Sequence, residues 1–325
     1  MASLFNIGGA VIKKYTVDTP YPVGPVHFYV KEYDDFLVLF DTGPNTNHAK
    51  EFLKQSIDLS KLKYLFVTHC HADHYGLIQF IKENSDAEIF ISKYDLFRLY
   101  NLDLRIKAMS RILKEIGMAD TTIEKIIGVL CMFAKEVPVP DGIRVLEEAD
   151  DILEDLKISY VRCPGHSQSD IVYLLDGKAI TGDVFLNGIF QTPLLDIDAD
   201  YEDDRFINYL YFCDTIKKMK ELEKKYEFLP GHRDYIDSVD ERVKFYVSKM
   251  CERMVSLKKY LKLGDILKAL KTIIPEPDAE PFKTYIKLSE ILFFKDFYEN
   301  PKLLLDSLKD AKIVIDNKDI MMCTD

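Results

Sequence analysis

The sequence predicts an α/β protein with a layered α/β domain over residues 1–240 and a mainly helical region over residues 241–325. In the first 92 residues, short apolar segments alternate with segments of helical composition, which is typical of a sheet covered by helices. Apolar residues then recur every three or four positions at about 94–140 and again beyond 240, which predicts helices. The length of 325 residues, with 47% apolar and 30% charged residues, indicates a globular protein with two domains, or one large domain with additions.

The first part of the chain contains four predicted strands and two predicted helices. The strands are apolar or alternating segments at 25–30, 36–40, 63–67 and 88–92. The helices are expected at 46–57 and 75–84. This order predicts a sheet with helices packed against it.

Residues 94–140 are predicted to form a helical insertion that caps the neighbouring loops and shapes a pocket. One helix face is marked by four apolar residues: Ile106, Met109, Leu113 and Ile116. Gly117 is placed to end this helix. A second helix is expected to begin at Thr121, with Glu124 completing a capping-box pattern, and to end before the V-P-V-P run at 137–140.

Strand patterns return after the insertion, at 157–162, 171–175 and 178–181, and another helix follows them. The buried face of that helix is predicted to consist of six residues: Phe206, Leu210, Cys213, Ile216, Met219 and Leu222. The charged residues of the KKMKELEKK segment are expected to form its solvated face.

Beyond residue 240 the predicted helices share an apolar stripe formed by Val243, Val247, Met250, Met254, Leu257 and Leu261. Asn300 followed by Pro301 resembles a helix start, and 312–322 resembles two strands joined by a turn. Helices followed by a hairpin suggest a winged-helix-like module. However, residues 241–325 carry 16 Lys and Arg against 14 Asp and Glu, so we expect them to support the fold or the pocket rather than bind nucleic acid strongly.

Composition also limits the location and the partners of the protein. The six cysteines lie far apart without a C-x-x-C pair: Cys70, Cys131, Cys163, Cys213, Cys251 and Cys323. Reduced thiols and a cytoplasmic protein are therefore expected. No apolar run approaches the roughly 18 residues of a membrane span, and the first residues do not resemble a secretory signal. The net charge of −11 argues against a general polyanion binder.

The strongest chemical signal is T-H-C-H-A-D-H-Y-G at 68–76, directly after a predicted strand. It contains His69, His71, Asp73 and His74 in an H-x-H-x-D-H pattern. Imidazoles two residues apart can point to the same side of an extended segment, while a following turn would bring the next carboxylate and imidazole to a neighbouring position. One loop can therefore serve two adjacent metal sites.

Two further histidines follow Pro-Gly turns after strand-like segments, His166 in CPGHS and His232 in LPGHR. Asp183 follows another strand-like segment in AITGDVF. These side chains could converge with the first cluster at one end of a sheet. His27 and His48 stand outside such patterns, and we expect them to be structural.

Together these segments resemble the metallo-β-lactamase superfamily over most of residues 5–235, and they are joined by Asp41 in the Asp-Thr-Gly turn after FLVLF. The resemblance implies an αββα sandwich with the metals at one edge of the two sheets. It also implies two ligand sets bridged by one carboxylate: His69, His71 and His166 for one metal, Asp73, His74 and His232 for the other, and Asp183 for both. Asp41 would hold a ligand imidazole without touching a metal.

Neutral imidazoles and carboxylates suit two divalent metal ions, with zinc expected first and iron or manganese as alternatives. A hydroxide shared by the two metals could attack an electrophile, and the metals would polarise that electrophile and stabilise the developing oxyanion. Asp73 is expected to act in catalysis by orienting that nucleophile.

The leading hypothesis is a dinuclear hydrolase, similar to glyoxalase II, that acts on a thioester, ester or lactone of a small molecule. A phosphodiesterase or endoribonuclease is the alternative, with nucleic acid as its partner. An iron oxidoreductase of the same fold is a further alternative. It would be either a flavodiiron protein or a persulfide dioxygenase using His69, His166 and Asp183. The sequence does not predict the oligomeric state.

Overall fold

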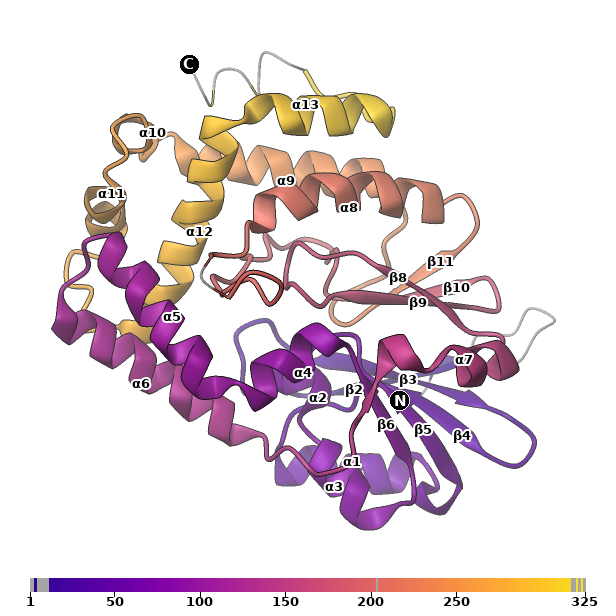
Figure 1. Cartoon of the computed structure of the whole chain (residues 1–325). Coiled ribbons are helices and arrows are strands. Elements are labelled where there is room, and N and C mark those ends of the chain that lie inside the picture. Colours follow the sequence, from indigo (N-terminus) through magenta and orange to yellow (C-terminus); the bar gives the residue numbers. More distant parts are fainter. Residues whose placement is uncertain (1–2, 5–11, 203, 317–319, 321–322, 324–325) are drawn as a thin grey trace.

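Two β-sheets packed face to face form the centre of this computed structural model, with helices outside both (Figure 1). The structure describes residues 3–4, 12–202, 204–316, 320 and 323. The larger sheet contains β1 (Ser3–Leu4), β2 (Ile12–Val17), β3 (Val26–Glu32), β4 (Leu37–Phe40), β5 (Leu62–Phe66), β6 (Glu88–Ile91) and β7 (Arg144–Val145), in that order. The smaller sheet has the order β11 (Glu227–Pro230), β10 (Lys178–Gly182), β9 (Ile171–Leu175) and β8 (Ser159–Arg162).

The strands are almost continuously apolar because both faces of each sheet are covered. In β4, Val38 and Phe40 point into the layer between the sheets, whereas Leu37 and Leu39 point to the outer helices. The ring of Tyr173 in β9 lies 5.3 Å from that of Phe40, so aromatic side chains from both sheets fill the inner layer.

Two groups of helices complete the four layers and confirm the αββα sandwich. The larger sheet is covered by α1 (Asn47–Ser56) and α3 (Ile78–Asn84), through residues such as Leu53 and Ile81. The smaller sheet is covered by α8 (Asn208–Leu222) and α9 (Val239–Met254), through residues such as Ile216 and Val247. In addition, α2 (Ala72–Tyr75) and α7 (Asp150–Leu156) are short helices between strands.

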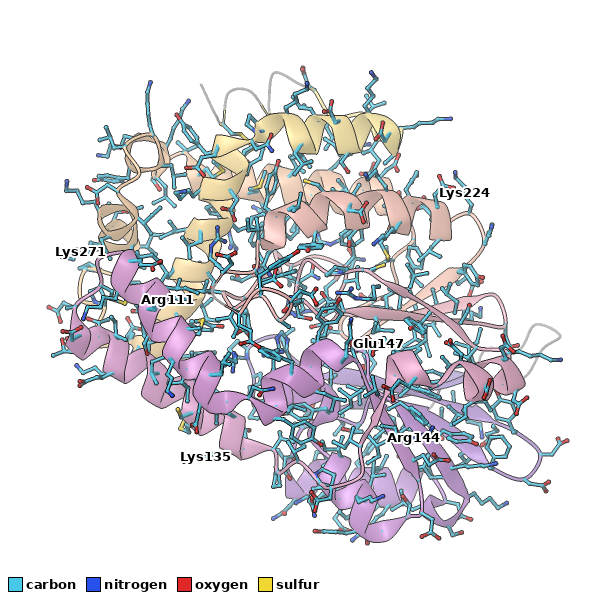
Figure 2. The ribbon with its side chains drawn as sticks, viewed as in Figure 1. Arg111, Lys135, Arg144, Glu147, Lys224 and Lys271 are labelled. Atoms are coloured by element: carbon cyan, nitrogen blue, oxygen red, sulfur yellow. A yellow bond between two sulfur atoms is a disulfide. The ribbon has the colours of Figure 1, made fainter. Side chains whose placement is uncertain are left out.

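The predicted insertion forms α4 (Lys93–Tyr100), α5 (Leu102–Glu115) and α6 (Asp120–Glu136). Gly117 adopts a φ of +87° after α5, as its predicted role at a helix end requires. The capping box at Thr121 is wrong, because α6 begins at Asp120 and the neighbouring hydroxyl of Thr122 donates instead to Asp278. The start of α4 is held by Glu147, which is labelled in Figure 2. Its carboxylate accepts hydrogen bonds from Ser92 Oγ and Lys93 N, both 2.8 Å long.

The C-terminal region is helical, with α10 (Lys258–Leu261), α11 (Ile266–Ile273), α12 (Pro281–Glu299) and α13 (Pro301–Asp310) following α9. All six residues of the apolar stripe predicted from Val243 to Leu261 are buried. In the stripe predicted for α8, Leu210 is an exception with 46% exposure. Because α12 packs against both α6 and α8 (Figure 1), the insertion, the smaller sheet and this region share one core.

Two predictions for the C-terminal region are wrong. No strand occurs at 312–316, and the rest of the proposed hairpin at 317–322 lies almost wholly outside the described residues. Cys251 and Cys323 form a disulfide bond, so this pair is not reduced, whereas Cys70, Cys131, Cys163 and Cys213 are free. The fold brings the paired cysteines together across 72 residues, and their sequence spacing gives no sign of it.

Candidate metal centre

All seven predicted ligand residues lie at one edge of the two sheets, five on loops and two in the short helix α2. His69 and His71 follow β5, whose chain continues directly into α2 with Asp73 and His74. The other three come from the smaller sheet, with His166 after β8, Asp183 after β10 and His232 after β11. Strand ends at a common edge thus bring residues far apart in sequence into one cluster.

Three histidines form the first half of this cluster, which we call the open half: His69, His71 and His166. The Nδ1 atom of His71 lies 3.0 Å from Nε2 of His69 and 3.1 Å from Nε2 of His166. These atoms could hold one metal ion. His71 and His166 are partly exposed, whereas His69 is buried, so this half faces the solvent on one side.

The second half consists of Asp73, His74 and His232, and we call it the buried half. His232 Nε2 lies 3.3 Å from Asp73 Oδ2, and all three side chains are buried. Asp183 lies between the halves, with Oδ1 3.3 Å from His74 Nε2 and Oδ2 3.8 Å from His166 Nε2. Its position allows one carboxylate to contact two ions.

Hydrogen bonds behind the imidazoles determine which nitrogen faces the cluster. His74 Nδ1 donates to Asp41 Oδ2 over 2.8 Å, and His232 Nδ1 donates to the carbonyl of Pro25 over 2.8 Å. Each Nε2 therefore presents a lone pair to nearby carboxylate oxygens in the neutral imidazole. Both Nε2 atoms and Asp183 Oδ1 are buried without a hydrogen-bond partner, an arrangement that a shared cation would satisfy. The donor set therefore fits divalent metal ions.

The electrostatics of the two halves differ. Burial, reinforced by the neighbouring imidazoles, lowers the pKa values of His69 and His71 well below the usual range, which keeps them neutral and able to bind metal. Burial also acts to lower the pKa of His74, but Asp183 and Asp41 outweigh it and raise that pKa. Asp183 and Asp41 thus stabilise positive charge next to His74, whether a proton or a metal carries it.

Asp41 links the buried half to the first ligand loop. Its Oδ1 accepts the backbone N–H of Thr68 and its Oδ2 accepts the Thr68 hydroxyl, both over 2.8 Å. Asp41 has a φ of +58°, which is unfavourable for a non-glycine residue and is often found at functional sites. The same carboxylate therefore orients the His74 ring and the start of the loop that carries His69.

Gly231, which precedes His232, leaves no room for a side chain. A Cβ at this position would lie 2.5 Å from Cε1 of His74 and 2.6 Å from Oδ1 of Asp183. The Pro-Gly turn seen in the sequence is thus required sterically by the cluster itself, and not only by the turn.

The two remaining histidines lie outside the cluster. His27 is buried, and its Nε2 donates to the carbonyl of Arg233 over 2.8 Å. His48 is exposed on α1. Neither belongs to a group of side chains that could hold a metal within the described residues.

The sequence alone did not identify Asp95, which holds the backbone between two residues of the open half, His69 and His71. Its Oδ2 accepts the backbone N–H of Cys70 over 2.7 Å, between two of the predicted ligands. Its Oδ1 accepts from Arg98, and Arg98 also pairs with Asp196 at 3.0 Å. No local pattern could reveal this role, because Asp95 has the sequence context of an ordinary residue in the first turn of a helix.

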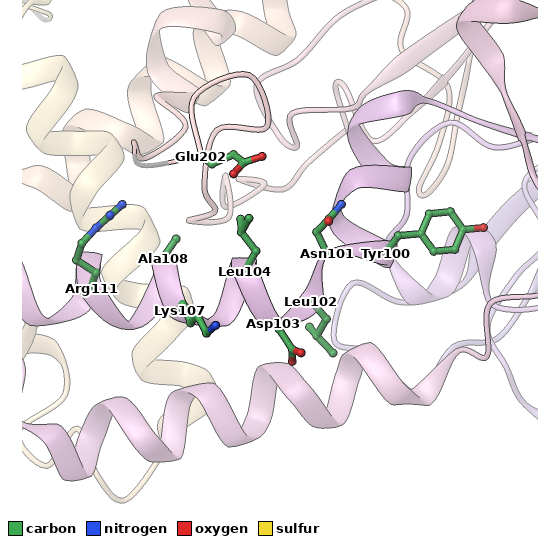
Figure 3. Close-up of a pocket in the computed structure, with 9 residues that line it drawn as sticks. All are labelled: Tyr100, Asn101, Leu102, Asp103, Leu104, Lys107, Ala108, Arg111 and Glu202. Carbon is green, nitrogen blue, oxygen red and sulfur yellow. The ribbon is translucent and has the colours of Figure 1, made fainter.

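A pocket beside the insertion is not lined by any of the seven residues. It has a volume of about 640 Å³ and lies between the α4–α5 junction and Glu202 (Figure 3). Leu104, Ala108 and Arg111 reach toward it from α5 (Figure 3). The metal cluster itself opens at His71 and His166.

Comparisons with known proteins identify the family of the chain. The family model described as the metallo-beta-lactamase superfamily matches residues 21–232, which include all seven ligand candidates. A Bacillus subtilis protein named "Probable metallo-hydrolase YqjP" is 27% identical over 262 residues, covering 75% of this chain and 78% of that protein.

Solved structures share the fold. The metallo-beta-lactamase family protein TTHA1429 from Thermus thermophilus has a TM-score of 0.64 at 18% identity, covering 88% of this chain and 93% of that one. A beta-lactamase domain protein from Burkholderia ambifaria has a TM-score of 0.65 at 15% identity, covering 91% and 89%. These shares of the chain are too large for residues 1–240 alone, so the likeness extends into the C-terminal helices.

Proposed function

The chain belongs to the metallo-β-lactamase superfamily, and on that premise we propose that it is a dinuclear metal-dependent hydrolase acting on a thioester, ester or lactone. The observation that supports this most is the convergence of two three-residue groups on either side of Asp183. The name of the Bacillus relative, a metallo-hydrolase, supports the same class of reaction.

We assign one ion to the open half and the other to the buried half, with Asp183 contacting both. Zinc is the first candidate, and iron or manganese would also suit nitrogen and oxygen ligands. When bound, the metals would supply a hydroxide nucleophile at neutral pH and polarise the carbonyl under attack.

The residues of the chain have distinct parts in this proposal. Asp73 would orient the attacking water, because its carboxylate lies beside His232 in the buried half. Asp41 would hold His74 in the tautomer that binds metal. Substrate would enter over His71 and His166, the two partly exposed ligand candidates.

We propose a small molecule as the substrate. The first strand of the hairpin expected for a winged-helix-like module is absent at 312–316, and the C-terminal region is nearly neutral, so little there favours nucleic-acid binding. No helix within the described part of the chain is long and apolar enough to cross a membrane. The four free cysteines support a cytoplasmic location, whereas the Cys251–Cys323 disulfide argues against it.

Metal content and activity should be measured together. Protein reconstituted with zinc, iron or manganese would be subjected to elemental analysis and tested on thioesters, lactones, phosphodiesters and RNA. We expect two ions per chain and hydrolysis of a thioester, ester or lactone that a chelator abolishes. His48→Ala, which changes an exposed histidine outside the cluster, serves as the control and should match the wild type.

Two results would contradict the proposal. A stoichiometry of one ion, unchanged by His232→Ala, would refute the dinuclear site. Metal-dependent cleavage of RNA without hydrolysis of the other substrates would favour the nuclease alternative.

A further inference from the structure

The backbone of Asp183 is tied to the C-terminal region through one side chain, Gln191. The amide nitrogen of Gln191 donates to the carbonyl oxygen of Asp183. Its amide oxygen accepts the backbone N–H of Leu186 over 3.0 Å and Nη2 of Arg242 over 3.1 Å. Gln191 thereby closes the loop after β10 on itself and connects it to α9.

Helix α9 holds the same loop at two more points. Arg242 Nη2 also donates to the carbonyl of Ile189, and the hydroxyl of Tyr246 donates to the carbonyl of Gln191 over 2.9 Å. Both the main chain and the side chain of Gln191 are therefore fixed by residues of one helix.

Arg242 is unusual because it is buried without a counterion. It is 3% exposed, and no carboxylate pairs with it in the part of the chain that the structure describes. Its Nε and Nη1 atoms have no hydrogen-bond partner, and burial lowers its pKa to about 10. The rings of Phe245 and Tyr246, whose centroids lie 4.8 and 5.8 Å from Cζ, compensate only in part. A buried charge of this kind does not favour folding by itself, so its contacts with the loop are its evident role.

We propose that Arg242 is a positioning residue for metal binding, acting through Gln191 on Asp183. The inference rests on the proposed function, since it concerns the carboxylate that would contact both ions. The carbonyl that Gln191 holds belongs to Asp183 itself, so rotation of this peptide would carry the carboxylate away from His74 and His166. Metal sites tolerate only small displacements of their ligands, about 0.5 Å. The C-terminal region would thus be part of the metal site without supplying a ligand.

The test measures zinc affinity by competition with a chelating dye. It compares variants of the two residues that connect α9 to Asp183 with a variant of a residue that has no contact with Asp183. Arg242→Met and Gln191→Met remove the two side-chain links and keep similar volumes. Each should weaken binding of both ions about 10- to 100-fold, as is typical when a supporting hydrogen bond behind a ligand is lost. The double variant should bind zinc no more weakly than the weaker-binding single variant, because both substitutions interrupt the same series of contacts from Arg242 through Gln191 to Asp183.

Tyr285→Phe is the matched control. Its hydroxyl donates over 2.7 Å to the carbonyl of Leu195, farther along the same loop and also from the C-terminal region, but it has no link to Asp183. Its zinc affinity should equal that of the wild type. Thermal unfolding of the metal-free proteins measures any general loss of stability separately.

The outcomes distinguish this inference from the proposed function. If the wild type binds zinc but the Arg242 and Gln191 variants bind it equally well, the inference is wrong and the function stands. Equal weakening in Tyr285→Phe would also refute it, because the effect would then be general loosening. If the wild type binds none of zinc, iron and manganese, the proposed function itself fails. Should Arg242→Met not fold, Gln191→Met decides alone.

Discussion

The two halves of the metal centre are built differently, although each contributes three side chains. In the buried half, His74 is held by Asp41 and His232 by a carbonyl oxygen, and neither imidazole is exposed. In the open half, His71 and His166 contact mainly other imidazoles and are partly exposed. The comparison indicates that the buried half is part of the folded core, whereas the open half is the side that faces solvent, where we propose that substrate enters.

The largest effect is expected where the halves meet. Asp183→Ala removes the carboxylate that lies between them, so both ions should bind poorly and hydrolysis should fall below detection. Elemental analysis and the turnover rate measure this directly. A variant that keeps two tightly bound ions, or loses less activity than Asp41→Ala, would contradict the bridging role.

A smaller effect, greater in the buried half than in the open half, is expected for Asp41→Ala, because Asp41 contacts His74 directly but reaches His69 only through Thr68. The substitution leaves the Nδ1 of His74 without its acceptor and frees Thr68, so zinc binding to the buried half should weaken about 10- to 100-fold. The open half should retain its ion. Asp58→Ala, an exposed carboxylate on another loop, is the control and should leave both affinities unchanged. If both ions weaken equally, the halves are less independent than the comparison implies.

The metal-free protein tests the comparison through stability. His232→Ala removes a fully buried ring and leaves the carbonyl of Pro25 without its donor, so the free energy of unfolding should fall by about 1–3 kcal/mol. His71→Ala changes a partly exposed ring and should cost less than about 1 kcal/mol. Urea denaturation in the presence of a chelator measures both. Equal losses would mean that the open half is also structural.

The sequence predicted the sandwich and the ligand candidates for different physical reasons. Strands such as 171–175 could be recognised because both of their faces are buried and their runs are continuously apolar. The ligand candidates could be recognised because short loops carry them in dense local patterns, as at 68–74.

What the sequence did not predict depends on long-range contacts. Asp278 meets Thr122 across 156 residues and replaces the expected capping box. Asp95 and Arg242 reach the metal loops only after folding, and neither stands in a pattern that differs from an ordinary helical surface. The assignment of each ligand and the domain boundary at 240 remain predictions.

The smallest effect is expected at the edge of the site, where the insertion meets it. The hydroxyl of Tyr21 donates to Glu136 Oε1 over 2.6 Å at the end of α6, and the Nδ2 atom of Asn45 donates to the carbonyl of the same glutamate. Tyr21 is also close enough to Asp73 for that carboxylate to contribute, after burial and Glu136, to the rise in the tyrosine pKa. The insertion is therefore anchored beside the buried half by a contact that includes no ligand candidate.

Tyr21→Phe should consequently loosen the insertion without disturbing the metals. We expect KM to rise a few-fold, on the order of the 0.5–1.5 kcal/mol that one hydrogen bond contributes, while kcat and zinc affinity stay unchanged. Tyr100→Phe, an exposed tyrosine on α4, is the control. A fall in kcat or in zinc affinity would place Tyr21 within the metal centre. An unchanged KM would mean that the insertion is a peripheral helical addition and that the open half alone determines access.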